Sequence, residues 1–178
     1  MDDKELYKQF LKGNMTAFEE IVIKHKDRLI YFIMQYVKNF EVAEDLAQDA
    51  FVYILINKKE YDFKYSLKTY LYTIAKSRAI NYLKKERRIV PLINDLMDDQ
   101  AIEENIYRKE IKQNVRKAIK KLKPEYQSAI YLADIEELSY REISKILTKS
   151  MPQVKILIYR ARRKLEEILK REECRYNG

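Results

Sequence analysis

The stretch SYREISKILTKSMPQVKILIYRARRKL (residues 139–165) predicts two helices joined by a very short turn. Each helix begins with a capping pattern, in which a serine is followed three residues later by a side chain that caps in return. The two pairs are Ser139 with Glu142 and Ser150 with Gln153. Only residues 148–150 separate the helices, and Pro152 is tolerated because the first helical turn does not use its N–H. This spacing favours helix-turn-helix geometry over an ordinary helical hairpin.

Apolar side chains on these two helices are spaced to form a small core between them: Ile143, Leu147, Val154 and Ile158. The segment before them has the same helical character. Residues 107–122 carry apolar side chains three and four apart, and Pro124 suits the first turn of a further helix. We therefore expect residues 107–178 to form one small helical domain.

The first ninety residues predict a second helical domain. Its four expected helices are a short one capped by Asp2 or Asp3 and ended by Gly13-Asn14, one from a Thr16–Glu19 capping box to about Lys38, one over 41–57 and one over 67–88. Residues 57–66 have no clean period and are expected to form a loop.

The composition changes after Pro91, which ends the last of these helices. Residues 94–106 hold five acidic residues and no basic one, which indicates a linker, with an ordinary solvated loop as the alternative. Two glycines and three prolines in the whole chain are few for a turn-rich β fold. We expect an all-α fold of two small helical domains, 1–90 and 107–178, joined by a flexible acidic linker over 91–106.

Composition also limits the class of protein. The 178 residues are 47% hydrophobic and 36% charged, which suits a soluble protein with a buried core. The single cysteine, Cys174, excludes an internal disulfide, and the longest uncharged run near the front, 29–37, is half of what a membrane span needs. The charged N-terminus lacks the apolar core of a signal peptide. A reduced, cytoplasmic setting is therefore expected.

The net charge of +8 is unevenly distributed. Residues 149–171 contain eight Lys or Arg against two Glu, and residues 76–88 contain six against one. A protein charged only for solubility more often mixes its signs. Two basic helices, one in each half, favour two contacts on one polyanion, because neutralising phosphates releases condensed counterions.

The helix expected over 67–88 has two different faces. One side is apolar and carries Leu67, Leu71, Ile74, Ala75 and Tyr82, with Arg78 expected either to extend along it or to pair with an acid. The opposite arc mixes bases, hydroxyls and a ring: Tyr70, Thr73, Lys76, Ser77, Lys84, Arg87 and Arg88. Such a mixture suits single-stranded nucleic acid, where rings stack on bases and cations follow phosphates. A membrane-surface helix is the alternative.

Three motifs in order resemble the extracytoplasmic-function (ECF) group of bacterial sigma-70 factors: AEDLAQDAF (43–51), YLYTIAKSRAINYLKKERR (70–88) and LSYREISKIL with SMPQVKILIYRARRKL (138–165). The resemblance covers nearly the whole chain. It implies an alternative sigma factor that directs core RNA polymerase to promoter DNA, binds the −35 element as duplex, melts the −10 element and performs no chemistry itself. It also implies an anti-sigma factor as partner, often membrane-anchored, which would hold the cytoplasmic protein at the inner face of the membrane.

The resemblance also implies three sets of site residues. Asp45, Gln48 and Asp49 would bind the polymerase; helix capping and solubility are the alternative roles for these acids. The −10 strand would be held by Tyr61, Phe63, Tyr65, Tyr70, Lys76, Ser77, Arg78, Asn81, Lys84 and Lys85, although the loop aromatics have the alternative of packing into the core. The −35 duplex would be contacted by Arg141, Ser150, Met151, Gln153, Lys155, Arg160 and Arg162, the arginines mostly on phosphates or against neighbouring helices.

The sequence departs from the family's pattern in four places. Tyr70 stands where tryptophan is common, and Ser77 where asparagine is common, so the −10 preference is open. The turn carries Thr148 and Lys149 and lacks the usual glycine. Ile156-Leu157 replaces a polar pair, which predicts weaker or differently oriented −35 binding. In the linker, five acids are hypothesised to mimic nucleic acid in a polymerase channel.

Three other classes of function compete with this interpretation. A stand-alone helix-turn-helix regulator that binds duplex DNA as a dimer explains residues 139–171 but neither the helix over 67–88 nor the acids at 45–49. An enzyme is poorly supported, because the only histidine, His25, lies between two lysines and is expected to be solvated. The sequence has no Gly-rich phosphate loop, metal-ligand spacing or nucleophile motif. We therefore predict no catalytic residue, metal, cofactor or small-molecule substrate. A helical protein-interaction module would leave both basic helices unexplained.

Overall fold

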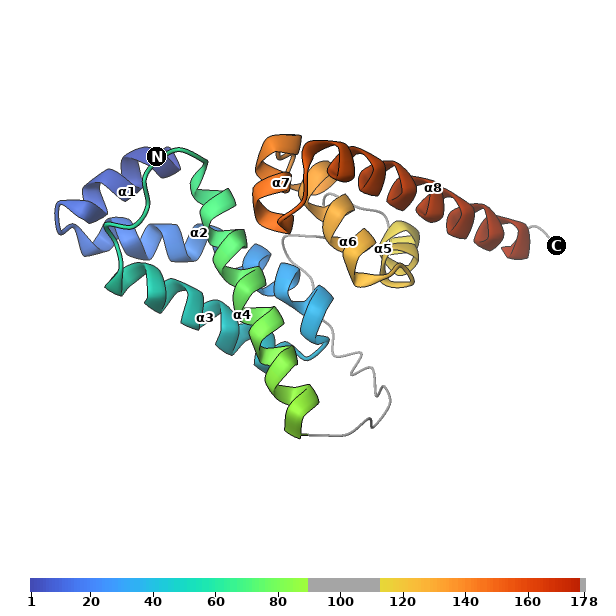
Figure 1. The fold of residues 1–178 in the computed structure, drawn as a ribbon, viewed down its shortest axis with the longest axis horizontal. Coiled ribbons are helices and arrows are strands. Elements are labelled where there is room, and N and C mark those ends of the chain that lie inside the picture. The colour runs from blue at the N-terminus through green and yellow to red at the C-terminus, as the bar shows by residue number, and fades with distance from the viewer. Residues whose placement is uncertain (90–112, 177–178) are drawn as a thin grey trace. The chain divides into compact units, whose positions relative to one another are not determined.

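The computed structural model describes residues 1–89 and 113–176, and every regular element in these ranges is a helix (Figure 1). The chain divides into two compact units, Met1–Ile102 and Glu103–Gly178. The all-α fold class is thus confirmed. The proposed linker 91–106 lies outside the described residues, as do both predicted domain boundaries and the start of the helix expected from 107.

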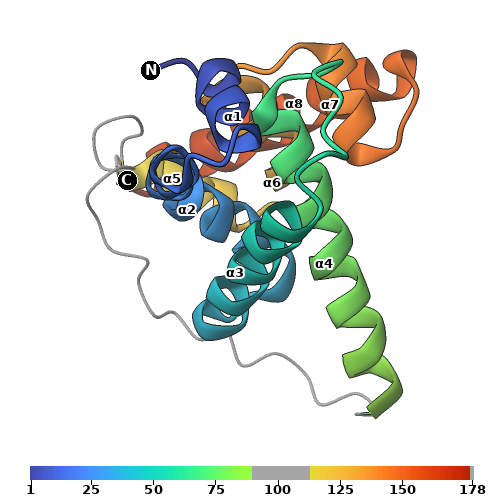
Figure 2. The same cartoon turned by 90° about the vertical axis from the view of Figure 1, so that its left-hand side faces the viewer.

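The first unit contains four helices: α1 (Asp3–Leu11), α2 (Met15–Val37), α3 (Phe40–Ile56) and α4 (Leu67–Ile89). Helix α2 lies against the other three, and α3 also contacts α4. In Figure 2, α4 extends beyond α3. The core is formed by aliphatic and aromatic side chains from all four helices, including Leu6, Phe10, Ile21, Phe32, Ile54 and Leu71.

The capping box expected at Thr16 and Glu19 is wrong. Gly13 has a left-handed φ of +98° and Asn14 is extended, so α2 begins at Met15 and Thr16 lies inside its first turn. The Asn14 side chain accepts the Ala17 N–H instead, at 3.3 Å. Asparagine caps a helix at least as well as threonine, and Asn14 is the residue that caps α2. Asp2 stands at the N-cap of α1 but makes no capping hydrogen bond with its side chain.

The second unit contains α5 (Gln113–Lys120), α6 (Pro124–Ile130), a π-helical turn over Tyr131–Ile135, α7 (Tyr140–Leu147) and α8 (Met151–Tyr176). Pro124 occupies the first turn of α6, as the sequence predicts. The π-helical turn was not predicted, since no local pattern marks it. The small core expected between α7 and α8 is present, with its four apolar side chains buried.

Both predicted caps of the helix-turn-helix are present. The Ser139 hydroxyl accepts the Glu142 N–H, and the Glu142 carboxylate accepts the Ser139 N–H in return. Ser150 and Gln153 repeat this exchange at 3.3 and 2.8 Å. These reciprocal bonds start α7 and α8 at fixed positions, so the turn between them is set by side chains at both ends.

None of the helices in the described parts of the chain combines the length and the apolar character that a membrane span requires.

Candidate nucleic-acid interface

Helix α3 presents an acidic face that the fold does not use. Asp45, Gln48 and Asp49 are all exposed, and their spacing of three and four places them on one side of the helix. The opposite side is buried and carries Ala43, Leu46, Ala47, Ala50 and Ile54. The three polar side chains are therefore available to a partner.

Helix capping does not account for these acids. The N-cap of α3 is Asn39, whose side chain accepts the Val42 N–H at 3.0 Å. Asp45 and Asp49 lie beyond the first turn, where the helix dipole has little effect. Their role as polymerase contacts stays a prediction, but the capping alternative loses its main support.

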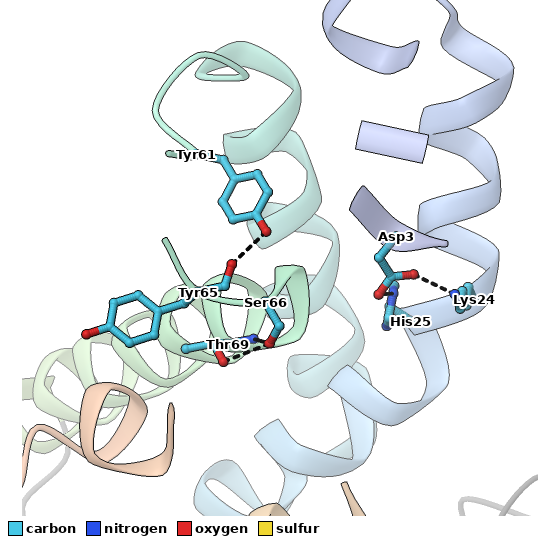
Figure 3. A network of polar contacts seen from close by, with 7 residues as sticks. All are labelled: Asp3, Lys24, His25, Tyr61, Tyr65, Ser66 and Thr69. Atoms are coloured by element: carbon cyan, nitrogen blue, oxygen red, sulfur yellow. Dashed lines mark hydrogen bonds and ion pairs between the residues drawn. The ribbon is translucent and has the colours of Figure 1, made fainter. Parts of the chain in front are cut away.

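The 57–66 loop is built around a buried ring. Tyr61 is only 6% exposed and stacks on Tyr70, with ring centroids 5.2 Å apart and planes inclined by 25°. The Tyr61 hydroxyl donates a hydrogen bond to the carbonyl oxygen of Tyr65 at 2.8 Å (Figure 3). Tyr61 therefore supports the loop from inside. Phe63 and Tyr65 are half-buried and present part of their rings to solvent.

Burial raises the pKa of both stacked tyrosines, Tyr61 and Tyr70, to about 12. Both hydroxyls are protonated at neutral pH, as an ordinary tyrosine hydroxyl also is. Tyr61 uses its proton within the loop, whereas the Tyr70 hydroxyl, though buried, has no hydrogen-bond partner among the described residues. Replacing the Tyr70 hydroxyl by an apolar group would therefore break no hydrogen bond seen among the described residues.

Helix α4 turns one face to the core and the other to solvent. Its buried residues are Leu67, Thr69, Leu71, Tyr72, Ala75 and Ala79. Tyr72 and Ala79 were missing from the predicted core face, while Ile74 and Tyr82, placed there, are only half-buried. The exposed side carries Ser77, Asn81, Lys84, Lys85 and Arg87. A mixed polar and basic surface thus runs along α4.

The start of α4 follows directly from the loop. Ser66 accepts the Thr69 N–H at 3.3 Å and shares a hydrogen bond with the Thr69 hydroxyl at 3.0 Å (Figure 3). Arg78, expected to extend along the core face or pair with an acid, places its guanidinium 5.4 Å from the centroid of the Tyr53 ring. This cation–π contact links α4 to α3. Arg78, one of the predicted −10 residues, therefore already has a partner within the protein.

In the second unit, all seven predicted −35 residues are exposed. The inner side of α8 is occupied by Val154, Leu157, Ile158 and Ala161, all buried. The N-terminal turn of α8 therefore projects Met151, Gln153 and Lys155 away from the core. The Gln153 side-chain oxygen also accepts the Ser150 N–H. Its side-chain NH₂ group is therefore the part available to a base edge.

Two of the predicted arginines differ in their surroundings. The Arg162 guanidinium makes a two-point ion pair with Asp134, its Nε lying 3.1 Å from Asp134 Oδ2. This side-chain hydrogen bond raises the pKa of Arg162. Asp134 lies in the π-helical turn, so the unpredicted turn ties Arg162 to the protein's own surface. Arg160 is exposed on the outer side of α8.

The pair Ile156-Leu157 divides between core and solvent. Leu157 is 7% exposed and packs inside, whereas Ile156 is 51% exposed. One helical turn away, Tyr159 is exposed as well. Of this pair only Ile156 therefore lies on the solvent side of α8, where it forms an exposed apolar strip with Tyr159.

Sequence reasoning was wrong about His25. It is 5% exposed, and its Nε2 lies within hydrogen-bond distance, 2.9 Å, of Asp3 Oδ2; Asp3 also forms an ion pair with Lys24 (Figure 3). A signal was present in the sequence: Ile21 and Leu29, one turn before and one turn after, are both core residues. A side chain between them on the same face points inward. Tyr7, also fully buried, was missed.

Residues 21–89 match the protein family described as Sigma-70 region 2, and residues 112–165 match Sigma-70, region 4. The chain is 29% identical to the ECF RNA polymerase sigma factor SigW of Bacillus subtilis, over 94% of this chain and 96% of that protein. It is 27% identical to the ECF RNA polymerase sigma-E factor of Escherichia coli K12, over 93% of each.

The fold resembles a solved structure, the sigma factor RpoE in complex with the anti-sigma factor NepR from Bartonella quintana. The TM-score is 0.70 at 25% identity, over 86% of this chain and 96% of that one.

Proposed function

We propose that this chain, which belongs to the ECF group of the sigma-70 family, directs core RNA polymerase to promoters by binding the −35 duplex and opening the −10 element. One observation carries the proposal. The chain contains a capped helix-turn-helix whose reading face, the outer side of α8, is exposed. It also contains a separate helix, α4, which carries exposed basic residues and follows directly on the aromatic 57–66 loop. Duplex and single-stranded DNA need these two different kinds of surface.

The −35 duplex would be contacted by the N-terminal turn of α8. In helix-turn-helix proteins this part of the second helix faces base edges in the major groove. Lys155 and the Gln153 amide are donors suited to base acceptors, and the exposed Ile156 is suited to a thymine methyl group. Arg160 would contact phosphate, whereas Arg162 would first have to leave Asp134.

The −10 element would be opened on α4 and the 57–66 loop. Extruding a base costs a few kcal/mol, so the pocket must return that energy through stacking and hydrogen bonds. Phe63 and Tyr65 expose part of their rings for stacking, while Lys84 and Lys85 are placed for phosphates. Tyr61 would act indirectly, as the buried support of this surface.

Core polymerase would be bound through the outer face of α3. The exposed apolar residues Val52 and Ile56 lie on the same side of the helix as Asp45 and Asp49. An acidic first half followed by an apolar second half suits a partner with basic residues beside an apolar ridge. This face of α3 would thus hold the chain and core polymerase together in the holoenzyme.

An anti-sigma factor would regulate the chain. The solved structure of RpoE, 25% identical, is a complex with the anti-sigma factor NepR, which supports this class of partner. We further propose that the protein works in the cytoplasm and is sequestered by a membrane-anchored anti-sigma factor. Cofractionation with membranes before induction, and release afterwards, would test this arrangement.

The decisive experiment is in vitro transcription with core polymerase across a promoter library. The chain should support initiation from a defined promoter class, and neither chain nor core alone should do so. The double variant D45N/D49N should lose core binding measured by fluorescence anisotropy. The control E19Q/E20Q, which changes two exposed acids on α2, should keep it.

A stand-alone regulator is the competing function. It would bind its operator strongly without polymerase in a gel-shift assay, and D45N/D49N would leave that binding intact. Failure of the well-folded chain to support initiation from any promoter would refute the proposed function.

A further inference from the structure

Helix α1 contacts the 57–66 loop, although α2 and α3 lie between them in the sequence. Tyr7 is fully buried, and its hydroxyl donates a hydrogen bond to the carbonyl oxygen of Lys58 at 3.0 Å. The Tyr7 ring meets the rings of Tyr61 and Phe63 edge-on, at centroid distances of 4.7 and 5.9 Å. One side chain of α1 therefore contacts the loop at three points.

A second contact joins the same two segments. The ammonium group of Lys58 lies 5.6 Å from the centroid of the Phe10 ring. Phe10 is itself buried and packs against Tyr7 and against Phe18 of α2. The beginning of the loop thus rests on two adjacent rings of α1.

Helix α1 is in turn fixed to α2 by an ion pair. Asp3 lies 2.9 Å from the His25 Nε2 and 2.5 Å from the Lys24 ammonium (Figure 3). Burial alone would raise the pKa of Asp3, but the hydrogen bonds from His25 and Lys24 outweigh it and lower the pKa to about 2. The carboxylate is ionised at neutral pH, so α1 is held in a fixed position from which to contact the loop.

The loop needs such support because its backbone is strained at an aromatic residue. Phe63 has a φ of +59°, in the left-handed region that bulky side chains rarely adopt. Its ring contacts the rings of Tyr7 and Tyr61, whose centroids lie 5.9 and 4.6 Å away. Strained backbone of this kind persists only where neighbouring groups fix it.

We propose that α1 sets the conformation of the 57–66 loop, and that Tyr7 is the positioning residue through which it acts. The inference rests on the proposed function, since the conformation of the loop affects −10 selectivity only if the loop contacts the −10 element. Tyr7 is buried and would not touch DNA. The match to Sigma-70 region 2 begins at residue 21, so α1 lies outside it.

Hydrogen exchange on the free, full-length protein tests the structural half of the proposal. Y7L removes both ring contacts and the hydrogen bond, and Y7F removes the hydrogen bond alone. We expect amide exchange in residues 58–65 to speed up about tenfold in Y7L and less in Y7F. The control F32L also removes a buried ring from the first unit, but this ring packs edge-on against Tyr36 of α2 and Tyr72 of α4. Its loop exchange should match wild type.

Transcription tests the functional half. With core polymerase at saturation, the ratio of initiation from the best library promoter to initiation from −10 substitutions of that promoter should fall roughly tenfold in Y7L. It should fall about twofold to threefold in Y7F. Core affinity should be unchanged in both, and F32L should keep the wild-type ratio.

Three results would overturn the proposal: loop exchange that is unchanged in Y7L, loop exchange that rises equally in F32L, or a wild-type selectivity ratio in Y7L. If Y7L does not fold, Y7F alone decides, and wild-type behaviour in both assays refutes the proposal. If the wild-type chain initiates nowhere, the proposed function fails, while the exchange result still decides whether α1 controls the loop.

Discussion

The two surfaces expected to meet DNA are built in opposite ways. In the first unit, Tyr61 is buried, stacked on Tyr70 and in contact with Tyr7, so the aromatic loop is an extension of the core. In the second unit, the reading face is the outer side of α8, and the core is its inner side. No predicted −35 residue is buried, whereas one predicted −10 residue is.

This difference has a consequence for mutagenesis. Where a surface extends the core, changing it alters stability and recognition together. Where the surface is the outer side of a capped helix, a substitution can alter recognition without altering stability. Surface substitutions away from caps and ion pairs change stability little. A surface that must deform to capture a base benefits from rings that fix its starting shape, while a helix that reads a rigid duplex needs only correct placement.

The largest effect is expected from Y61A. Removing a buried aromatic side chain costs about 3–5 kcal/mol of unfolding free energy, and initiation should fall with it. Y159A, which removes an exposed ring from α8, should change stability by less than about 0.5 kcal/mol. Urea unfolding of both variants measures this contrast. Equal losses in the two variants would contradict the comparison.

On the second surface, K155A should alter recognition alone. If Lys155 contacts a base edge, the variant should lose about 1–3 kcal/mol of discrimination at one −35 position, with unchanged stability. K170A is the matched control, since Lys170 is an exposed lysine of the same helix that is paired with Glu166. Filter binding of the holoenzyme to substituted promoters is the measurement. A stability loss of 1 kcal/mol or more in K155A would show that the surface is not separable from the fold.

A smaller effect, and a gain, is expected from T148G. Thr148 ends α7 with a φ of +56°, which disfavours a β-branched residue by roughly 1 kcal/mol and suits glycine. The variant should therefore be more stable by up to about 1 kcal/mol, with unchanged −35 recognition. K145G, inside α7, should instead lose about 1 kcal/mol. A thermal melt that ranks K145G above T148G would disprove the account.

The smallest effect concerns acid stability of the first unit. Because the pKa of Asp3 is lowered to about 2 from an ordinary value of 3.8, the folded state gains stability above the ordinary value. That gain is lost as the pH falls from about 4 to 2. In D3N this part of the pH dependence should disappear, with a loss at neutral pH below about 1 kcal/mol because the group is partly solvated.

Acid titration of unfolding in wild type, D3N and the neighbouring control D2N checks this expectation. D2N should follow wild type, since the Asp2 side chain is exposed and makes no capping hydrogen bond. An unchanged acid profile in D3N would mean that the ion pair with His25 and Lys24 does not hold α1.

Local patterns predicted the second unit better than the first. The caps at Ser139 and Ser150 are short-range hydrogen bonds, so four consecutive residues suffice to recognise them. The false cap at Thr16 shows the limit of this reasoning, because Asn14 competes for the same helix start. The π-helical turn has no local sequence pattern, and the Asp134–Arg162 ion pair joins residues far apart in the sequence, so neither was predicted.

The sequence by itself determined the helices, most of their ends, the two helical units and the family, because periodicity and capping are local properties. Only the tertiary structure decided which side chains reach a partner. It buried Tyr61, His25 and Tyr7, engaged Arg78 and Arg162 within the protein, and left Ile156 exposed beside buried Leu157. Burial depends on neighbours brought together by folding, and a helical period does not identify those neighbours.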